Sequence, residues 1–124
     1  MATNYQRGAD FERRTAAYFE RIGYVTVRSA GSHSPADIVA MKGGDAICIQ
    51  CKRNGRLDPE EWNEFWEFCK TAGATPILAQ MGPQRKGITF SRLTGRKDGK
   101  GRQPLAHWAP QRGEGNEVQE SRSR

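Results

Sequence analysis

The segment Ala46–Arg53, AICIQCKR, alternates in a way that fits only a β-strand with two unlike faces. Successive side chains of a strand point to opposite faces. One face therefore carries Ile47, Ile49 and Cys51, and the other carries Cys48, Gln50 and Lys52. The apolar face is expected to pack against the hydrophobic core. An amide and an ammonium side by side are costly to bury, so Gln50 and Lys52 predict a binding face.

The rest of the chain up to Leu93 alternates between helical and strand patterns. Residues 10–22 have apolar side chains at helical spacing, and Gly23 follows them. A second helix begins at Asp58 with a cap, and its Glu61 has the spacing of a capping box; Gly73 ends it. The predicted strands are Tyr24–Ser29, Asp37–Met41, Ala46–Arg53, Thr75–Met81 and Gly87–Leu93. The order α-β-β-β-α-β-β predicts an α/β fold with a mixed central sheet flanked by helices.

Beyond Leu93 the periodic patterns stop. Gly95–Pro104 is basic and glycine-rich and is expected to be a mobile loop, whereas Gln111–Arg124 is polar and is expected to be a disordered tail. Between them, His107 and Trp108 are expected to pack a terminal segment onto the core. The sequence thus predicts one domain over residues 1–110 and a tail over 111–124.

The charges of the chain are unevenly placed. It has 20 basic and 14 acidic residues, a net charge of +6, but five acids lie within 58–67. Without those five acids and without the last fourteen residues, 17 basic and 6 acidic groups remain. A field of that sign favours a polyanion, most commonly nucleic acid.

Composition also excludes several classes of protein. No apolar run is long enough to span a membrane, so no membrane partner is expected. The N-terminal residues lack the apolar core of a secretory signal, and three cysteines argue against a disulfide framework. These features predict a cytoplasmic protein, compatible with prokaryotic or viral origin.

Asp37 opens a strand thirteen residues before Gln50, which predicts a metal site between paired strands. Mg²⁺ prefers oxygen ligands and keeps several waters. We expect ligands from the Asp37 carboxylate, the Gln50 amide oxygen and the Cys51 backbone carbonyl, with Glu12 direct or through water. Lys52 would then orient or deprotonate a water that attacks a phosphodiester. Taken alone, the pattern is short and more often describes a surface hairpin with an ordinary ion pair.

Three segments in order strengthen the catalytic interpretation. Gln6–Arg14 (QRGADFERR), Val27–Ala40 (VRSAGSHSPADIVA) and Ile47–Arg53 (ICIQCKR) together resemble the archaeal-type Holliday junction resolvases of the PD-(D/E)xK nuclease superfamily. The resemblance runs from about Arg7 to Leu93 and implies a restriction-endonuclease-like core. It implies Mg²⁺, with Mn²⁺ as a substitute, as cofactor.

The resemblance assigns roles residue by residue. Glu12 matches the helix-borne acid, Asp37 the metal-binding aspartate and Lys52 the catalytic lysine. Ser32 resembles the active-site serine of a mobile loop, although the loop is one residue longer here. Arg13 and Arg28 match arginines that contact the junction backbone.

The chain departs from the family pattern at two places. Gln50 stands where the family usually has Glu, which removes one negative charge and predicts weaker metal binding or a need for more Mg²⁺ or Mn²⁺. Gln80 and Met81 stand where a lysine is frequent, and the basic pair Arg85 and Lys86 is the expected substitute.

The sequence therefore predicts a metal-dependent, homodimeric endonuclease that resolves four-way junction DNA by paired nicks. Its phosphate contacts would come from Arg13, Arg28, Arg53, Arg56, Arg85, Lys86 and the Gly95–Arg102 loop. One alternative is another nuclease of the superfamily, acting in repair or restriction, and a second is a non-catalytic DNA-binding module.

Two further motifs have simpler interpretations. Cys48 and Cys51 have the spacing of half a zinc site, but on a strand they face opposite sides, so we interpret them as structural thiols. His33 is close to Asp37 in sequence and is interpreted as an exposed loop histidine.

Overall fold

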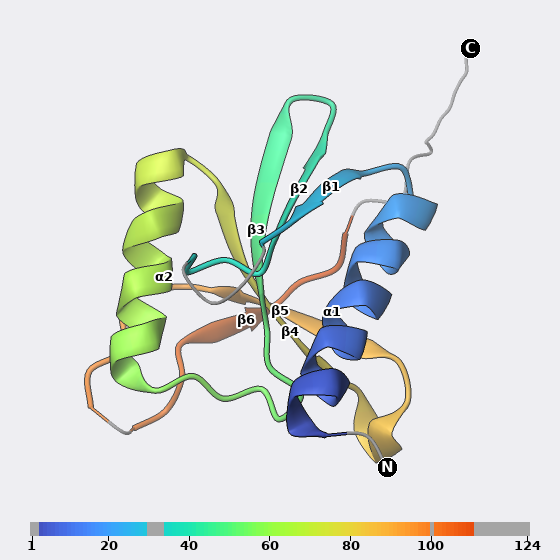
Figure 1. Cartoon of the computed structure of the whole chain (residues 1–124). Helices are drawn as coiled ribbons and strands as arrows, with labels where there is room; N and C mark the ends of the chain where they lie inside the picture. The colour runs from blue at the N-terminus through green and yellow to red at the C-terminus, as the bar shows by residue number, and fades with distance from the viewer. Residues whose placement is uncertain (1–2, 30–33, 100, 111–124) are drawn as a thin grey trace.

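The computed structural model describes residues 3–29, 34–99 and 101–110, and its elements form a sheet between two helices (Figure 1). In chain order they are α1 (Asn4–Arg21), β1 (Val25–Arg28), β2 (Ile38–Lys42), β3 (Asp45–Cys51), α2 (Pro59–Ala72), β4 (Thr75–Met81), the 3₁₀ turn η1 (Pro83–Arg85), β5 (Ile88–Leu93) and β6 (Leu105–His107). The predicted disordered tail over 111–124 lies outside the described residues.

The six strands lie in the order in which they occur in the chain. All neighbouring pairs are antiparallel except β3 and β4, which run parallel and are joined through α2. The turn between β2 and β3 is the glycine pair Gly43-Gly44, with φ values of 57° and 88°, a conformation suited to a two-residue hairpin. The predicted mixed sheet flanked by helices is confirmed.

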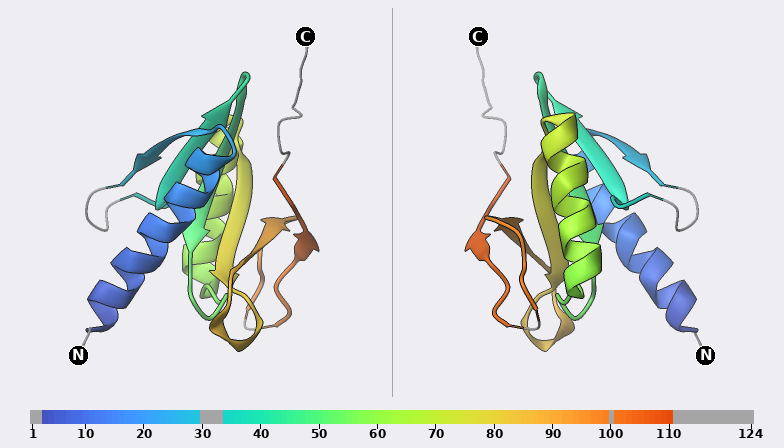
Figure 2. Two further views of the ribbon diagram at one scale, coloured as in Figure 1. Left: turned by 90° about the vertical axis from the view of Figure 1, so that its right-hand side faces the viewer. Right: turned by 90° about the vertical axis from the view of Figure 1, so that its left-hand side faces the viewer.

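α1 and α2 lie on opposite faces of the sheet (Figure 2). Alternate residues of the central strands supply a core beneath each helix. On one face α1 buries Phe11, Ala16 and Phe19 against Ile38, Ala40, Ile47, Ile49, Ile77, Ala79 and Phe90. On the other face α2 buries Trp62, Phe65 and Cys69 against Cys48, Leu78 and Leu93. The predicted division of β3 into two faces is confirmed. However, the face of Cys48 and Gln50, which was expected to be a binding face, is covered by α2, because β3 is a central strand.

Three features of the fold differ from the prediction or extend it. α1 begins at Asn4, six residues before the predicted start, because Thr3 and Gln6 form a capping box ahead of the apolar stripe. β6 was not predicted, since a three-residue strand is too short to show a period. Trp108 packs against Phe19 and Phe90, as expected, while His107 is exposed.

Residues 95–99 and 101–104 after β5 are tied to the body of the protein by buried polar contacts, which contradicts the prediction of a mobile loop for these residues. Lys97 is only 3% exposed, and its Nζ donates to the Leu57 carbonyl at 2.8 Å. Gln103 accepts from the Leu57 N–H and donates to the Gly55 carbonyl. Polar anchors of this kind leave no hydrophobic period in the sequence, which is why the pattern did not reveal them.

No helix within the described residues is both long enough and apolar enough to cross a membrane.

Candidate active site

Asp37 lies just before β2 and is tied to β3 through both its backbone and its side chain. Its N–H donates to the Ile49 carbonyl at 2.9 Å, and its Oδ2 accepts from the Cys51 N–H at 2.8 Å. Backbone groups of residues two apart in a strand point to the same side. The Cys51 carbonyl therefore points to the same edge of β3 as the Ile49 carbonyl, toward Asp37. The two oxygen ligands expected from Asp37 and Cys51 are thus adjacent.

The carboxyl of Asp37 has an unusually high pKa for an aspartate. Burial raises the pKa from 3.8 to about 6 and outweighs the Cys51 N–H bond, which lowers it. The charges of Glu12 and Glu61 raise the same pKa and the charge of Lys52 lowers it, so all three side chains lie within electrostatic reach of Asp37. A partly buried carboxylate with more negative than positive neighbours is a site where a cation would relieve an electrostatic penalty.

Gln50 is 8% exposed on the α2 face of β3, and its amide is oriented by one strong contact. Nε2 donates to the Pro35 carbonyl at 2.6 Å. The two ends of a planar amide point apart, so Oε1 is directed away from that carbonyl. The amide nitrogen is thus engaged by Pro35, and the amide oxygen is the end of the side chain that Pro35 does not contact.

Lys52 follows the last residue of β3, and its ammonium lies 3.2 Å from Oε2 of Glu61 at the start of α2. The sequence assigned Glu61 only to a capping box. In the structure the Asp58 side chain does accept from the Glu61 N–H, but the Glu61 carboxylate forms an ion pair with the Lys52 ammonium. Sequence reasoning therefore missed a residue of this cluster. The sequence contained one signal for Glu61. It is a carboxylate in the first turn of the helix, and only a short loop separates that helix from Lys52.

Glu12 projects from α1 and pairs with Arg28 of β1 at 3.7 Å. This pair brings together the predicted helix-borne acid and one predicted DNA-binding arginine. The other predicted arginine of α1, Arg13, is exposed and pairs with Asp10 at 3.0 Å. Glu12 and Asp37 thus come from elements 25 residues apart in sequence and meet at one end of the sheet.

The described residues contain no group of three His, Cys, Asp or Glu side chains that would by itself hold a metal. Cys48 lies in the core under α2, whereas Cys51 packs toward α1, so the two do not form half a zinc site, as predicted. Burial raises the pKa of the Cys51 thiol, which disfavours the thiolate that a metal would need. A cation here would depend on Asp37, amide and carbonyl oxygens and water.

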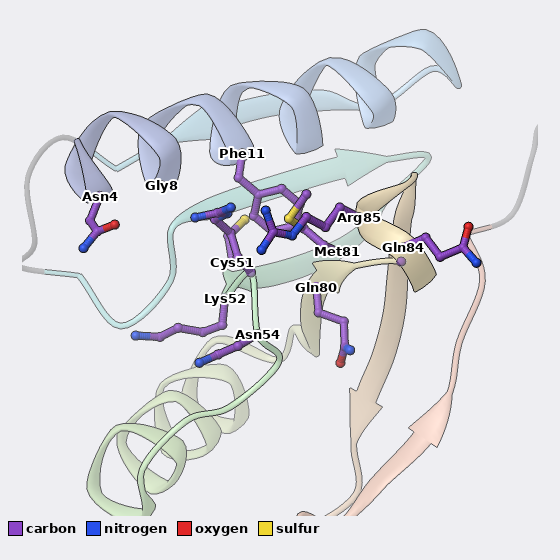
Figure 3. Close-up of a pocket in the computed structure, with 12 residues that line it drawn as sticks. Asn4, Gly8, Phe11, Cys51, Lys52, Asn54, Gln80, Met81, Gln84 and Arg85 are labelled. Atoms are coloured by element: carbon purple, nitrogen blue, oxygen red, sulfur yellow. The ribbon is translucent and has the colours of Figure 1, made fainter. Parts of the chain in front are cut away.

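An open groove of about 880 Å³ adjoins this cluster between α1, the end of β3 and the turn after β4 (Figure 3). In Figure 3, Lys52 and Asn54 extend on one side of the groove, and Arg85 reaches from the turn after β4 toward Cys51 and Phe11. The basic residues that line the groove are Lys52, Arg53 and Arg85, and Gln80 and Met81 lie between them. Its chemistry suits a phosphate backbone.

Gly55 closes the turn that places Lys52 beside this groove. Its φ is +74°, and its N–H donates to the Lys52 carbonyl at 2.8 Å. A Cβ at this position would lie 2.3 Å from Oε1 of Gln80. Only glycine fits the turn without displacing a residue of the groove.

The remaining predicted residues are dispersed. Arg56 and Lys86 are exposed, and neither lines the groove. Within the Gly95–Arg102 loop, Lys97 is buried and unable to contact DNA, which corrects that part of the prediction. Ser32 and His33 lie outside the described residues.

Comparisons with known proteins agree with the fold. A family model described as archaeal Holliday junction resolvase (Hjc) matches residues 3–100. A crossover junction endodeoxyribonuclease Hjc from Methanocaldococcus jannaschii is 29% identical over 83 residues, which are 64% of this chain and 62% of the relative. The matched region thus spans less than two thirds of that relative.

A solved structure of Archaeoglobus fulgidus Hjc, described as a Holliday junction resolvase from an archaeal hyperthermophile, is also similar. Its sequence is 26% identical, and the TM-score is 0.59 over 68% of this chain and 70% of that one.

Proposed function

Because the chain belongs to the archaeal Holliday junction resolvase family, we propose that it is a metal-dependent endonuclease that resolves four-way DNA junctions by paired symmetric nicks, in recombination, repair or replication. The observation that carries this proposal is the hydrogen bond between Asp37 Oδ2 and the Cys51 N–H, 2.8 Å long, with Lys52 as the next residue. It supports one compact site for a cation, a water and a phosphate.

The residues present fit a hard cation that is held by few charges. The ligands would be the Asp37 carboxylate, the Cys51 carbonyl and Gln50 Oε1, with Glu12 direct or through water. When bound there, Mg²⁺, or Mn²⁺ in its place, would acidify a water and neutralise charge on the phosphate. Because Gln50 is neutral, we expect weaker metal binding or a need for more Mg²⁺ or Mn²⁺.

Lys52 would act on the attacking water and on the phosphate. Its side chain is 33% exposed, at the mouth of the groove, so substrate can reach it. Its ammonium, paired with Glu61, would orient the attacking water and donate to a non-bridging phosphate oxygen as charge develops. Ser32 remains a predicted active-site residue of the preceding loop.

The groove would hold the DNA strand next to the cut. Arg53, which follows β3, and Arg85 of η1 line it, which supports phosphate contacts in the groove. Arg13, Arg28, Arg56 and Lys86 are proposed to contact phosphates farther away, including across the junction. Contacts of this type make binding salt-sensitive and weakly dependent on sequence.

Paired nicks also require two active sites. Two symmetric cuts in opposed strands follow most simply from a two-fold homodimer, so we propose that assembly.

The test compares nicking of a synthetic four-way junction with nicking of linear, flap and fork DNAs, in Mg²⁺ and in Mn²⁺. We expect selective, paired cleavage of the junction and no cleavage by Asp37→Asn or Lys52→Ala. Equal rates on linear duplex would instead favour another nuclease activity of the superfamily.

A non-catalytic DNA-binding module is the second candidate. The neutral Gln50 beside Asp37 favours it, because the site then has one less charge with which to hold a metal. Junction binding without nicking in either metal would establish this candidate.

A further inference from the structure

We propose that Glu61 is a positioning residue of the active site, which holds the Lys52 ammonium where the reaction needs it. The inference rests on the proposed nuclease function. Its basis is the ion pair of 3.2 Å between Lys52 Nζ and Glu61 Oε2, which joins the end of β3 to the first turn of α2.

The backbone of Lys52 is pinned, but its side chain needs a second anchor. The Lys52 N–H donates to the Ala79 carbonyl at 2.9 Å, and the Lys52 carbonyl accepts from Gly55 at 2.8 Å. Four rotatable bonds separate this fixed backbone from Nζ. Within the described part of the chain, Glu61 is the residue that contacts Nζ, so it selects the rotamer.

Glu61 is itself rigidly mounted. Asp58 Oδ1 accepts from its N–H at 2.8 Å. The next residue, Trp62, is fully buried, and its Nε1 donates to the Gly95 carbonyl at 2.8 Å. The backbone of Glu61 is therefore held in place on both sides. Its carboxylate points away from the helix cap and toward Lys52.

The other polar groups near Lys52 are engaged elsewhere. Glu12 pairs with Arg28, Gln50 is neutral and donates to Pro35, and Asp37 accepts from Cys51. Glu61 is the carboxylate that these contacts leave to Lys52. Both partners are partly exposed, 33% for Lys52 and 44% for Glu61, so the pair contributes little to stability. Its value lies in the placement of Nζ.

The experiment uses the full chain with Glu61→Ala, the conservative Glu61→Gln and the control Glu60→Ala. Glu60 is exposed in the same helical turn, so its removal reproduces the loss of charge at the helix N-terminus. We expect Glu61→Ala to lower the single-turnover rate on saturating junction by up to about 100-fold, and Glu61→Gln to lower it less because an acceptor oxygen remains. Glu60→Ala should cleave at a rate within about 2-fold of the wild-type rate, because Glu60 does not hold Lys52 and a surface charge has a small effect.

Two measurements separate positioning from binding and folding. The dissociation constant for the junction in EDTA and the unfolding midpoint should be the same in Glu61→Ala as in Glu60→Ala, because both variants lose one charge at the start of α2. In the metal-free protein, NMR should show distinct shifts for the two Lys52 Hε protons in the wild type and Glu60→Ala, and merged shifts in Glu61→Ala. This readout needs neither metal nor activity.

Each outcome decides the matter. Wild-type cleavage by Glu61→Ala, or equal losses in Glu61→Ala and Glu60→Ala, overturns this inference and leaves the proposed function intact. A wild-type protein that nicks no DNA overturns the proposed function and the inference together. If Glu61→Ala fails to fold, Glu61→Gln decides by the same rate and Hε measurements, and wild-type values for both overturn the inference.

Discussion

Asp37 Oδ2 accepts a hydrogen bond from the Cys51 N–H at 2.8 Å, so the residue before β2 is held by the last residue of β3. The bond places a partly buried carboxylate beside the backbone of Cys51, the residue that precedes Lys52. It cannot fully offset the burial of the charge, because the pKa of Asp37 is still raised to about 6. The folded protein therefore bears a cost at the position where the proposed chemistry needs a negative charge.

Asp37→Asn should abolish nicking and stabilise the protein at neutral pH. The raised pKa means that, as pH increases from about 4 to about 6, the unfolded chain loses the Asp37 proton while the folded protein retains it, so stability falls. Asn carries no charge, so it has no cost of burying a carboxylate, and its amide oxygen can still accept from the Cys51 N–H. We expect a gain of about 1–3 kcal/mol in the free energy of unfolding at pH 8, vanishing near pH 4. Urea denaturation in EDTA measures it, and a less stable variant at pH 8 would contradict the origin of the shift.

Metal binding should weaken as pH falls through about 6, because the Asp37 carboxyl must lose its proton to act as a ligand. A ligand that binds only the folded protein raises the unfolding midpoint. Mg²⁺ or Mn²⁺ should therefore raise the midpoint more at pH 8 than at pH 5, and Asp37→Asn should remove this difference. Thermal unfolding in metal and in EDTA provides the comparison. An equal effect of metal at both pH values would place the cation elsewhere.

The groove arginines should contribute to affinity and not to chemistry. Arg53→Ala and Arg85→Ala are each expected to weaken junction binding and to reduce the slope of log K against log salt by about 1. Arg92→Ala is the matched control, because Arg92 is exposed on β5 and does not line the groove. Titrations at several salt concentrations test this, and identical slopes for all three variants would exclude the groove as a DNA site.

Lys97 should act in folding and not in DNA binding. Lys97→Ala removes the donor to the Leu57 carbonyl and leaves a buried acceptor unpaired, at a cost of about 1–3 kcal/mol. Arg102→Ala, at an exposed position of the same segment, should change the free energy of unfolding by less than about 0.5 kcal/mol. Chemical denaturation compares the two. The folded Lys97→Ala protein should bind the junction with the affinity of the wild type. A lower affinity would show that Lys97 contributes to DNA binding.

The parts of the site that depend on local pattern were predictable. The period of two in β3 assigned Ile47 and Ile49 to one face and Gln50 to the other, because alternation is a property of any extended backbone. The cap at Asp58 and the stop at Gly73 followed for the same reason, since helix ends are set by groups a few residues away. The order of helices and strands up to β5 was predicted from these local signals.

Contacts between distant residues were not predictable. The Glu61 carboxylate had two partners within reach, the helix cap and Lys52, and the choice depends on how α2 packs against the sheet. Lys97 carries the charge of a surface residue, and only the position of Leu57, forty residues earlier, makes its burial possible.

The sequence by itself determined which side chains face the core and which residue types could bind a metal and a phosphate, because periodicity and chemical type are local. The tertiary structure alone decided that Asp37 is held by Cys51, that Lys52 is held by Glu61 and that Lys97 is buried. Those outcomes depend on the packing of two helices against opposite faces of one sheet, which sets the distance and the dielectric environment of each charge.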